Sequence, residues 1–172
     1  LNDLHFDKLD LTNNTIDERI KDFKAVLENL VLKSYNTANI DHILFVIGND
    51  MFNTDNIHNT TTNGTPQSVN ATWDVAYEKV FTAMADSIAY LKTFCNELTV
   101  MLVPGNHDRT KSYYLAHGLE TYFRNDKSII FDRSSCLKKV FTYGETFLGF
   151  NHGNNINDKL PLAFATEFIE EW

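Results

Sequence analysis

The order of predicted elements along the chain indicates an α/β fold with a largely parallel sheet. Two continuous β-branched and aromatic runs, residues 42–47 (HILFVI) and 98–103 (LTVMLV), predict strands that are buried on both faces. A helical pattern precedes each run, and a third helix and shorter strands follow. Such an alternation places helices on the faces of a parallel sheet. We therefore predict one α/β domain, whose 172 residues can bury a sizeable core.

In the first half of the chain, the helices are predicted from apolar spacing and the loop from composition. Residues 15–35 form the first helix, because Thr15 and Glu18 make a capping-box start. Its apolar positions recur at spacings of three and four: Ile16, Ile20, Phe23, Leu27 and Leu30. Residues 51–71 are rich in Asn and Thr and form a long loop, which at that length is expected to be functional or mobile. The helix over residues 73–94 is expected to present one face made of Trp73, Tyr77, Val80, Met84, Ile88 and Leu91.

The second half of the chain is predicted to hold one helix, three short strands and a helical tail. The third helix is expected over residues 111–123. The short strands are expected at residues 128–131, 138–141 and 146–150. The last two strands are separated by a Gly-containing turn, which predicts a hairpin. Residues 160–172 complete the chain as a predicted helix.

Composition narrows the class of protein. A net charge of −8 argues against general nucleic-acid binding through clustered Lys and Arg, but bound cations can reverse the local field and leave a nucleic-acid substrate open. Cys95 and Cys136 match no metal-binding spacing and are expected to be free thiols of a reducing compartment. No apolar run reaches the roughly 18 residues of a membrane span, and no signal-peptide pattern is present. These observations predict a cytoplasmic protein.

Polar residues follow the carboxyl ends of the predicted strands, where reactive groups lie in open α/β sheets. Gly48-Asn49-Asp50, Gly105-Asn106-His107-Asp108 and Asn151-His152-Gly153 each follow a predicted strand. Asp3-Leu4-His5 lies at the start of the sequence, where we expect a preceding strand to have ended. Each segment alone fits ordinary turn or capping chemistry. The ordered set indicates that four segments bring Asp, His and Asn side chains to one edge of a sheet. The other histidines, His42, His58 and His117, are expected to be non-catalytic, and His58 is the best placed of them to reach a substrate from its loop.

Together these segments resemble the first four motifs of the calcineurin-like metallophosphoesterase superfamily. The resemblance spans almost the whole chain, and Gly-Asn-His-Asp after an apolar strand is its most specific element. The run Asp50-Met51-Phe52-Asn53 and the loop behind it are similar to the branch of DNA-repair exonucleases and their phage-like relatives. The resemblance implies a four-layer α-β-β-α sandwich of two sheets between helices, with the second sheet incomplete in this chain.

The resemblance also implies a ligand set for two metal ions. Asp3 and His5 would bind the first metal, and Asp50 would bridge both. Asn106 and His152 would bind the second. A carboxylate can bridge because it has two oxygens, and a mixed carboxylate, imidazole and amide set suits Mn²⁺ best here, with Fe or Zn²⁺ as alternatives.

Two further residues carry implied catalytic roles. His107 would donate a proton to the leaving oxygen, since His is the usual general acid near neutral pH. Asp108 would either orient His107 or cap the helix that follows it.

Two features depart from the family pattern. Asn49 stands between Gly48 and the bridging Asp50, where the family places glycine directly before the aspartate. The family's final Gly-His-x-His motif is missing, because no histidine follows His152. We therefore expect the chain to be a fragment truncated at both ends, which lacks the first strand and one protein ligand for each metal and has weak or absent activity by itself.

Three functions are consistent with these observations. The first is a two-metal phosphodiesterase that acts as a DNA exonuclease or related nuclease, using a metal-activated hydroxide and a histidine acid. The second is a phosphomonoesterase of the same fold that acts on a protein or a small molecule. The third is a scaffold that has lost its metals. The expected partner is a phosphodiester substrate such as DNA, with no membrane, and a partner subunit is left open.

Overall fold

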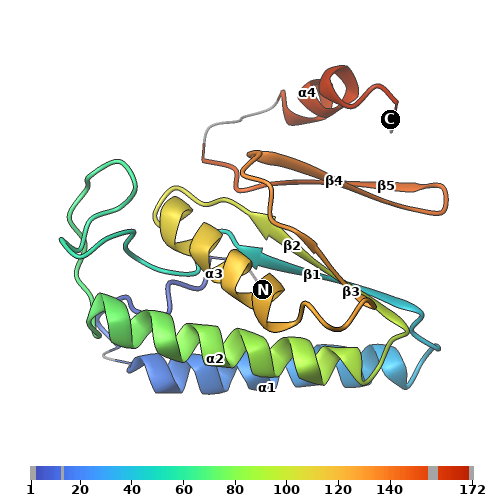
Figure 1. The fold of residues 1–172 in the computed structure, drawn as a ribbon. Coiled ribbons are helices and arrows are strands. Elements are labelled where there is room, and N and C mark those ends of the chain that lie inside the picture. The colour runs from blue at the N-terminus through green and yellow to red at the C-terminus, as the bar shows by residue number, and fades with distance from the viewer. Residues whose placement is uncertain (1–2, 13, 155–158, 171–172) are drawn as a thin grey trace.

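A parallel three-stranded sheet forms the centre of the computed structural model, which describes residues 3–12, 14–154 and 159–170 (Figure 1). Its strands lie in the order β1 (His42–Gly48), β2 (Glu97–Val103) and β3 (Ile129–Asp132). Gly48 pairs with Val103 at the last position of the first ladder, so β1 and β2 end side by side. This shared end brings the loops that follow the two strands together.

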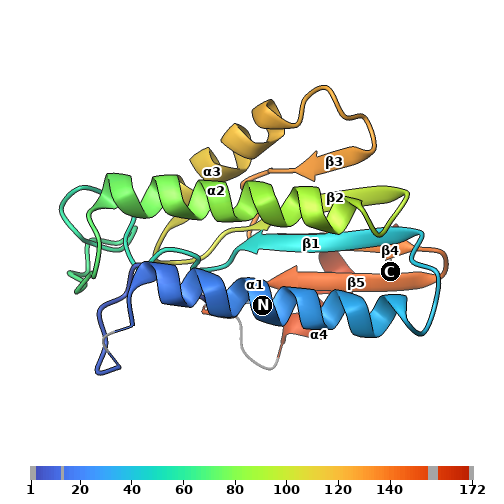
Figure 2. The same cartoon turned by 90° about the horizontal axis from the view of Figure 1, so that it is seen from below.

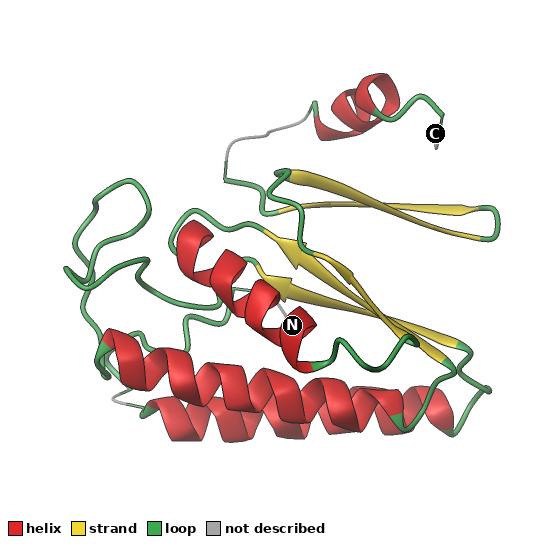
Figure 3. Cartoon of the chain, in the orientation of Figure 1, coloured by secondary structure: helices red, strands yellow, loops and turns green. Residues whose placement is uncertain are grey.

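The other elements lie in layers on the two faces of this sheet. Figures 1 and 2 show α1 (Ile16–Tyr35), α2 (Trp73–Lys92) and α3 (Arg109–Tyr122) on one face. The antiparallel hairpin of β4 (Lys138–Tyr143) and β5 (Thr146–Asn151) lies on the opposite face, and α4 (Leu160–Glu167) lies beyond it. The predicted α/β class is confirmed, and the described elements follow a helix, sheet, sheet, helix order (Figure 3).

The core lies between the helices and the three-stranded sheet. From α1 it receives Ile16, Phe23, Leu27 and Val31. Leu30 was expected on this face but is 52% exposed, because the stripe spaced by four continues at Val31, one residue further round the helix. Val80, Met84, Ile88 and Leu91 of α2 are buried as expected, whereas Trp73 is 49% exposed at the first position of that helix.

Several element boundaries differ from the predicted ones. The helix α3 begins at Arg109, two residues before the predicted start. The helix α4 ends at Glu167, so the predicted helix over 160–172 is too long within the described chain, and positions 171–172 lie outside the described residues. Cys95 is buried and Cys136 is exposed, and both are free thiols as expected. No helix among the described residues has the length and apolarity needed to cross a membrane.

Candidate metal centre

The N-terminal segment lies beside the chain that leaves β1. The amide of Asp3 donates to the carbonyl of Asn49 at 3.0 Å, and the amide of His5 donates to the carbonyl of Asp50 at 3.0 Å. These two bonds align Asp3 and His5 with the polar turn at the end of β1. Two of the four predicted segments are therefore adjacent through main-chain pairing alone.

The backbone of these segments is strained. Gly48, Asn49 and Asp50 have φ values of 81°, 58° and 60°, so three consecutive residues adopt the left-handed region. Asp3 and His5 are left-handed as well, with φ values of 60° and 41°. Asn49 is accommodated in this turn, where its amide donates to the carbonyl of Val103 at 2.7 Å. Strain of this kind gathers at functional sites and persists because surrounding contacts enforce it.

One oxygen of the Asp50 carboxylate is fixed by the loop after β2. The Oδ1 atom accepts a hydrogen bond from the amide of His107 at 2.8 Å. A Cβ atom at Gly105 would lie 1.9 Å from this same oxygen, so only glycine allows the two loops to approach this closely. The carboxylate is consequently held in one orientation and is 3% exposed.

The other oxygen of Asp50 lies between two groups of potential ligands. On one side the Nε2 atom of His5 is 4.0 Å from Asp50 Oδ2 and 2.9 Å from Asp3 Oδ1. On the other side the Nε2 atom of His152 is 3.0 Å from Asp50 Oδ2 and 2.7 Å from Asn106 Oδ1. The structure therefore brings together all five residues expected to bind metals, with Asp50 in the shared position.

His107 lies against the first of these groups. Its ring is 4.6 Å from the ring of His5 between centroids, and His5, Asp50 and His107 each offer a ligand atom within 4.8 Å of the others. The Nδ1 atom of His107 is 3.0 Å from the carbonyl oxygen of Asn53, which places the proton on Nδ1. The Nε2 atom of His107 is then available either to bind a metal or to carry a proton.

Asp108 is completely buried and does not cap the helix as one expectation had it. Its side chain makes no capping hydrogen bond, and its Oδ2 atom instead accepts from the amide of Phe52 at 2.9 Å. Asp55 from the long loop takes the capping role, accepting from the amide of Lys111 at 2.7 Å. The ring of His107 is oriented by the Asn53 carbonyl. Burial raises the pKa of Asp108 to about 8.

Sequence reasoning missed the contributions of Asn53 and Asp55. Both residues lie in the loop over residues 51–71, and hydrogen bonds hold this loop against the start of α3 and the residue His107 before it. The amide of Thr62 donates to the carbonyl of His107 at 3.1 Å, and its hydroxyl accepts from the amide of Arg109 at 3.1 Å. The sequence does not indicate which main-chain carbonyl accepts a hydrogen bond from a side chain. An Asp in an Asn- and Thr-rich loop is also typical of an ordinary turn.

The donor chemistry of the centre fits divalent cations. Oxygens of Asp50 and Asn106 both face the Nε2 atom of His152, whereas a neutral imidazole has at most one proton there to share. Burial lowers the pKa of His5 below its ordinary value although Asp3 opposes the shift, and the neutral ring is the form that binds metals. Its buried Nδ1 atom has no hydrogen-bond partner among the described residues. These carboxylate, amide and imidazole atoms suit Mn²⁺, Fe or Zn²⁺.

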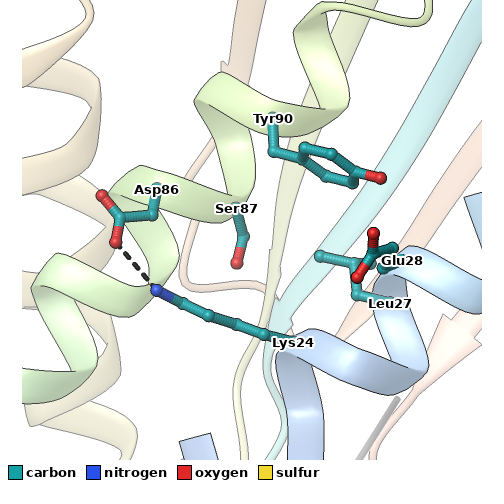
Figure 4. A pocket seen from close by; sticks show the side chains of 6 residues that line it. All are labelled: Lys24, Leu27, Glu28, Asp86, Ser87 and Tyr90. Carbon is teal, nitrogen blue, oxygen red and sulfur yellow. Dashed lines mark hydrogen bonds and ion pairs between the residues drawn. The ribbon is translucent and has the colours of Figure 1, made fainter. Parts of the chain in front are cut away.

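The remaining histidines and the cavity between α1 and α2 lie outside this centre. His42 is held by Glu97 at 3.1 Å and by Thr99 at 2.9 Å, while His58 and His117 are exposed. A cavity of about 230 Å³ opens between the two helices (Figure 4). Among its lining residues, Lys24 donates to Asp86 at 2.8 Å, and Ser87 donates to the carbonyl of Ala83 in its own helix.

The fold and the site together define a class, an α/β protein with a strand-end centre suited to divalent metal ions. The family model for calcineurin-like phosphoesterase matches residues 1–170. The chain therefore belongs to the calcineurin-like phosphoesterase family, whose members are metal-dependent hydrolases of phosphoesters. No curated protein and no solved structure matches the chain.

Proposed function

We propose that the protein is a two-metal phosphodiesterase that acts on DNA as a nuclease. The observation that carries the proposal is the position of Asp50 Oδ2, which lies 3.0 Å from His152 Nε2 on one side and 4.0 Å from His5 Nε2 on the other. A shared carboxylate between two ligand groups is what a pair of cations about 3.5–4 Å apart requires. The similarity of the Asp50-Met51-Phe52-Asn53 run to exonucleases supports DNA as the substrate.

The metal ions would be held by the two ligand groups. Asp3 and His5 would hold one, Asn106 and His152 the other, and Asp50 both, with Mn²⁺ as the proposed ion. When bound, such a pair polarises the phosphoryl oxygen, lowers the pKa of water and stabilises charge on the attacking and leaving oxygens. The protein contributes the orientation of the ligands through the left-handed turn and the close contact at Gly105.

His107 is the proposed general acid. The Asn53 carbonyl fixes its Nδ1 proton, so the Nε2 atom is the ring nitrogen left to hold the proton that passes to the leaving oxygen. Its amide also donates to Asp50, which ties the acid to the carboxylate shared by both ligand groups. Of the proposed ligands, Asn106 follows the same strand as the acid, β2, and the others come from other segments.

A substrate panel tests this function. With Mn²⁺ present, we expect hydrolysis of bis-p-nitrophenyl phosphate and of single-stranded DNA to exceed hydrolysis of p-nitrophenyl phosphate. His152→Gln should remove the activity, whereas His117→Gln, at an exposed position of α3, should retain it. Faster hydrolysis of the monoester would favour a phosphomonoesterase. If calorimetry detects no Mn²⁺ binding, the scaffold function replaces both enzyme functions.

A further inference from the structure

Three buried polar side chains lie behind the metal centre and take no part in the proposed metal binding. Asp7, Thr54 and Lys111 are 0%, 1% and 6% exposed. They come from the N-terminal segment, the long loop and α3. Burying an ammonium and a carboxylate is costly, and apolar residues of similar volume would often hold a fold as well. A role other than packing would therefore explain why these polar side chains are buried.

The three side chains form a chain of contacts. The ammonium of Lys111 donates to the hydroxyl of Thr54 at 3.2 Å, and this hydroxyl donates to Asp7 Oδ2 at 3.4 Å. The ammonium lies 4.0 Å from the same Asp7 oxygen and 4.9 Å above the ring of Phe52. Burial lowers the pKa of Lys111, while Asp7 is the largest influence that opposes the shift.

The chain of contacts ends at the residue that orients the proposed acid. The other oxygen of Asp7, Oδ1, accepts from the amide of Asn53 at 2.6 Å. The Asn53 side chain donates to the carbonyl of Ser68 at 2.9 Å, and its own carbonyl oxygen lies 3.0 Å from Nδ1 of His107. Asn53 is 1% exposed and is held on its amide and its side chain at once. These contacts consequently hold the Asn53 carbonyl in one position relative to His107.

We propose that Asp7, Thr54 and Lys111 are positioning residues that hold Asn53 and, through its carbonyl, keep the ring of His107 in the tautomer with a proton on Nδ1. This proposal rests on the proposed function for its catalytic consequence. These residues do not touch the reacting atoms. Their hydrogen bonds therefore act by orienting His107, in the way that the hydrogen-bond partners of metal-bound histidines orient those rings. The three residues therefore affect the proton transfer more than the binding of metal or substrate.

The leaving group of the substrate distinguishes this role from a merely structural one. An acid matters for a basic alkoxide leaving group and matters little for p-nitrophenolate, which leaves without a proton. In Thr54→Val, which keeps the volume and removes the hydroxyl, we expect kcat/KM for a thymidine dinucleotide to fall on the order of 10-fold more than for bis-p-nitrophenyl phosphate. Thr54→Ser should restore the wild-type ratio. Lys24→Met at the exposed pair with Asp86 is the control and should leave the ratio unchanged.

Two further measurements extend the test, and the second of them does not depend on activity. The double variant Asp7→Asn with Lys111→Met removes both charges together and should show the same change of ratio as Thr54→Val. Nitrogen-15 NMR of the metal-free protein should report the Nδ1-protonated tautomer of His107 in wild type and a mixture of tautomers in Thr54→Val. Equal losses on both substrates, or an unchanged His107 tautomer, would overturn the positioning role. Wild-type protein that binds Mn²⁺ but cleaves neither substrate would overturn the proposed function instead, and the NMR result would still decide the positioning role.

Discussion

The helical layer and the strand-end edge of this protein are stabilised in different ways. The helix α1 starts with a capping box in which Thr15 and Glu18 bond each other's main chain over three residues. At the strand ends, Asp3, Asn49 and Asp50 are left-handed, a conformation that few non-glycine residues adopt. Local rules account for the helix start, whereas contacts between distant segments enforce the edge.

The same contrast appears in the polar groups of the two regions. The ion pair of Lys24 and Asp86 lies at the surface of the helical layer, with side chains 43% and 59% exposed. Asp50 and Asp108 at the edge are buried, and Asp108 Oδ1 has no hydrogen-bond partner among the described residues. A surface pair contributes little to stability, but a buried polar group demands a partner or a function. The comparison predicts that changes at the edge alter activity, while changes in the helical layer alter stability alone.

The largest effect is expected at the shared carboxylate. Asp50→Asn keeps the shape and the bond from the His107 amide but removes the charge that both ligand groups share. We expect kcat/KM with Mn²⁺ to fall on the order of 10³-fold and Mn²⁺ binding to weaken, because this charge would hold both of the proposed ions. Steady-state kinetics and calorimetric Mn²⁺ titration measure the two losses. Retention of full activity in Asp50→Asn would show that the edge is not the active centre.

A smaller effect, on both stability and activity, is expected at the close contact between Gly105 and Asp50. Gly105→Ala places a methyl group 1.9 Å from Asp50 Oδ1, so the loops must separate. We expect a loss of about 1–3 kcal/mol in unfolding free energy together with a loss of activity. Urea unfolding and kinetics measure both. Gly144→Asn is the control, since Gly144 has open space around it, a φ of 58° that Asn tolerates and a place in the β4–β5 turn.

Most of the fold could be predicted from the sequence because its elements obey local rules. The strands β1 and β2 are continuous apolar runs, and Thr15 with Glu18 marks the start of α1. The exposed position of Leu30 escaped prediction, because spacing alone admits two neighbouring stripes and packing against α2 selects the one through Val31. The end of α4 escaped it as well, since apolar residues continue beyond Glu167.

The candidate site was predictable in its side chains and unpredictable in its backbone. Asp50 and Asn106 could be placed at one edge because parallel strands end together. His152 follows β5 of the antiparallel hairpin and approaches this edge from the second sheet. Nothing in the sequence reveals that the carbonyl of Asn53 orients His107 or that Asp55 replaces Asp108 as the helix cap. One contact joins the long loop to α3 and the other joins it to the residues just before α3, each across more than fifty positions. Such contacts depend on tertiary packing that composition and spacing do not encode.

The caps of α3 and α1 allow the two regions to be compared by matched substitutions. Asp55→Ala removes the acceptor for the Lys111 amide and for the Thr62 hydroxyl at 2.9 Å. We expect a loss of about 1–2 kcal/mol in unfolding free energy, and activity should fall too because the loop that carries Asn53 loosens. Denaturant unfolding and the dinucleotide assay measure the two effects. Normal activity in a destabilised Asp55→Ala would separate this cap from the site.

Thr15→Ala is the matching change in the helical layer. It removes the side chain that accepts from the Glu18 amide at 3.3 Å and that bonds the Glu18 carboxylate. The expected loss in unfolding free energy is about 1 kcal/mol, with kcat/KM unchanged. The same urea and kinetic measurements apply. A loss of activity comparable to that of Asp55→Ala would contradict the division of the molecule into two regions.

The smallest effect is expected at the surface beside α1, where acid should weaken one pair. The hydroxyl of Thr12 and the guanidinium of Arg19 hold the pKa of Asp10 at about 2, below its ordinary value of 3.8. A depressed pKa means that the contact stabilises the fold fully above the ordinary value and loses this contribution as the pH falls through about 2. At pH 5 the melting temperature of wild type should therefore exceed that of Asp10→Asn. This difference in melting temperature should shrink as acid protonates Asp10. A difference independent of pH would mean that Asp10 acts through packing rather than charge. Activity at pH 7 should be equal in the two proteins, because Asp10 belongs to the region that local contacts hold.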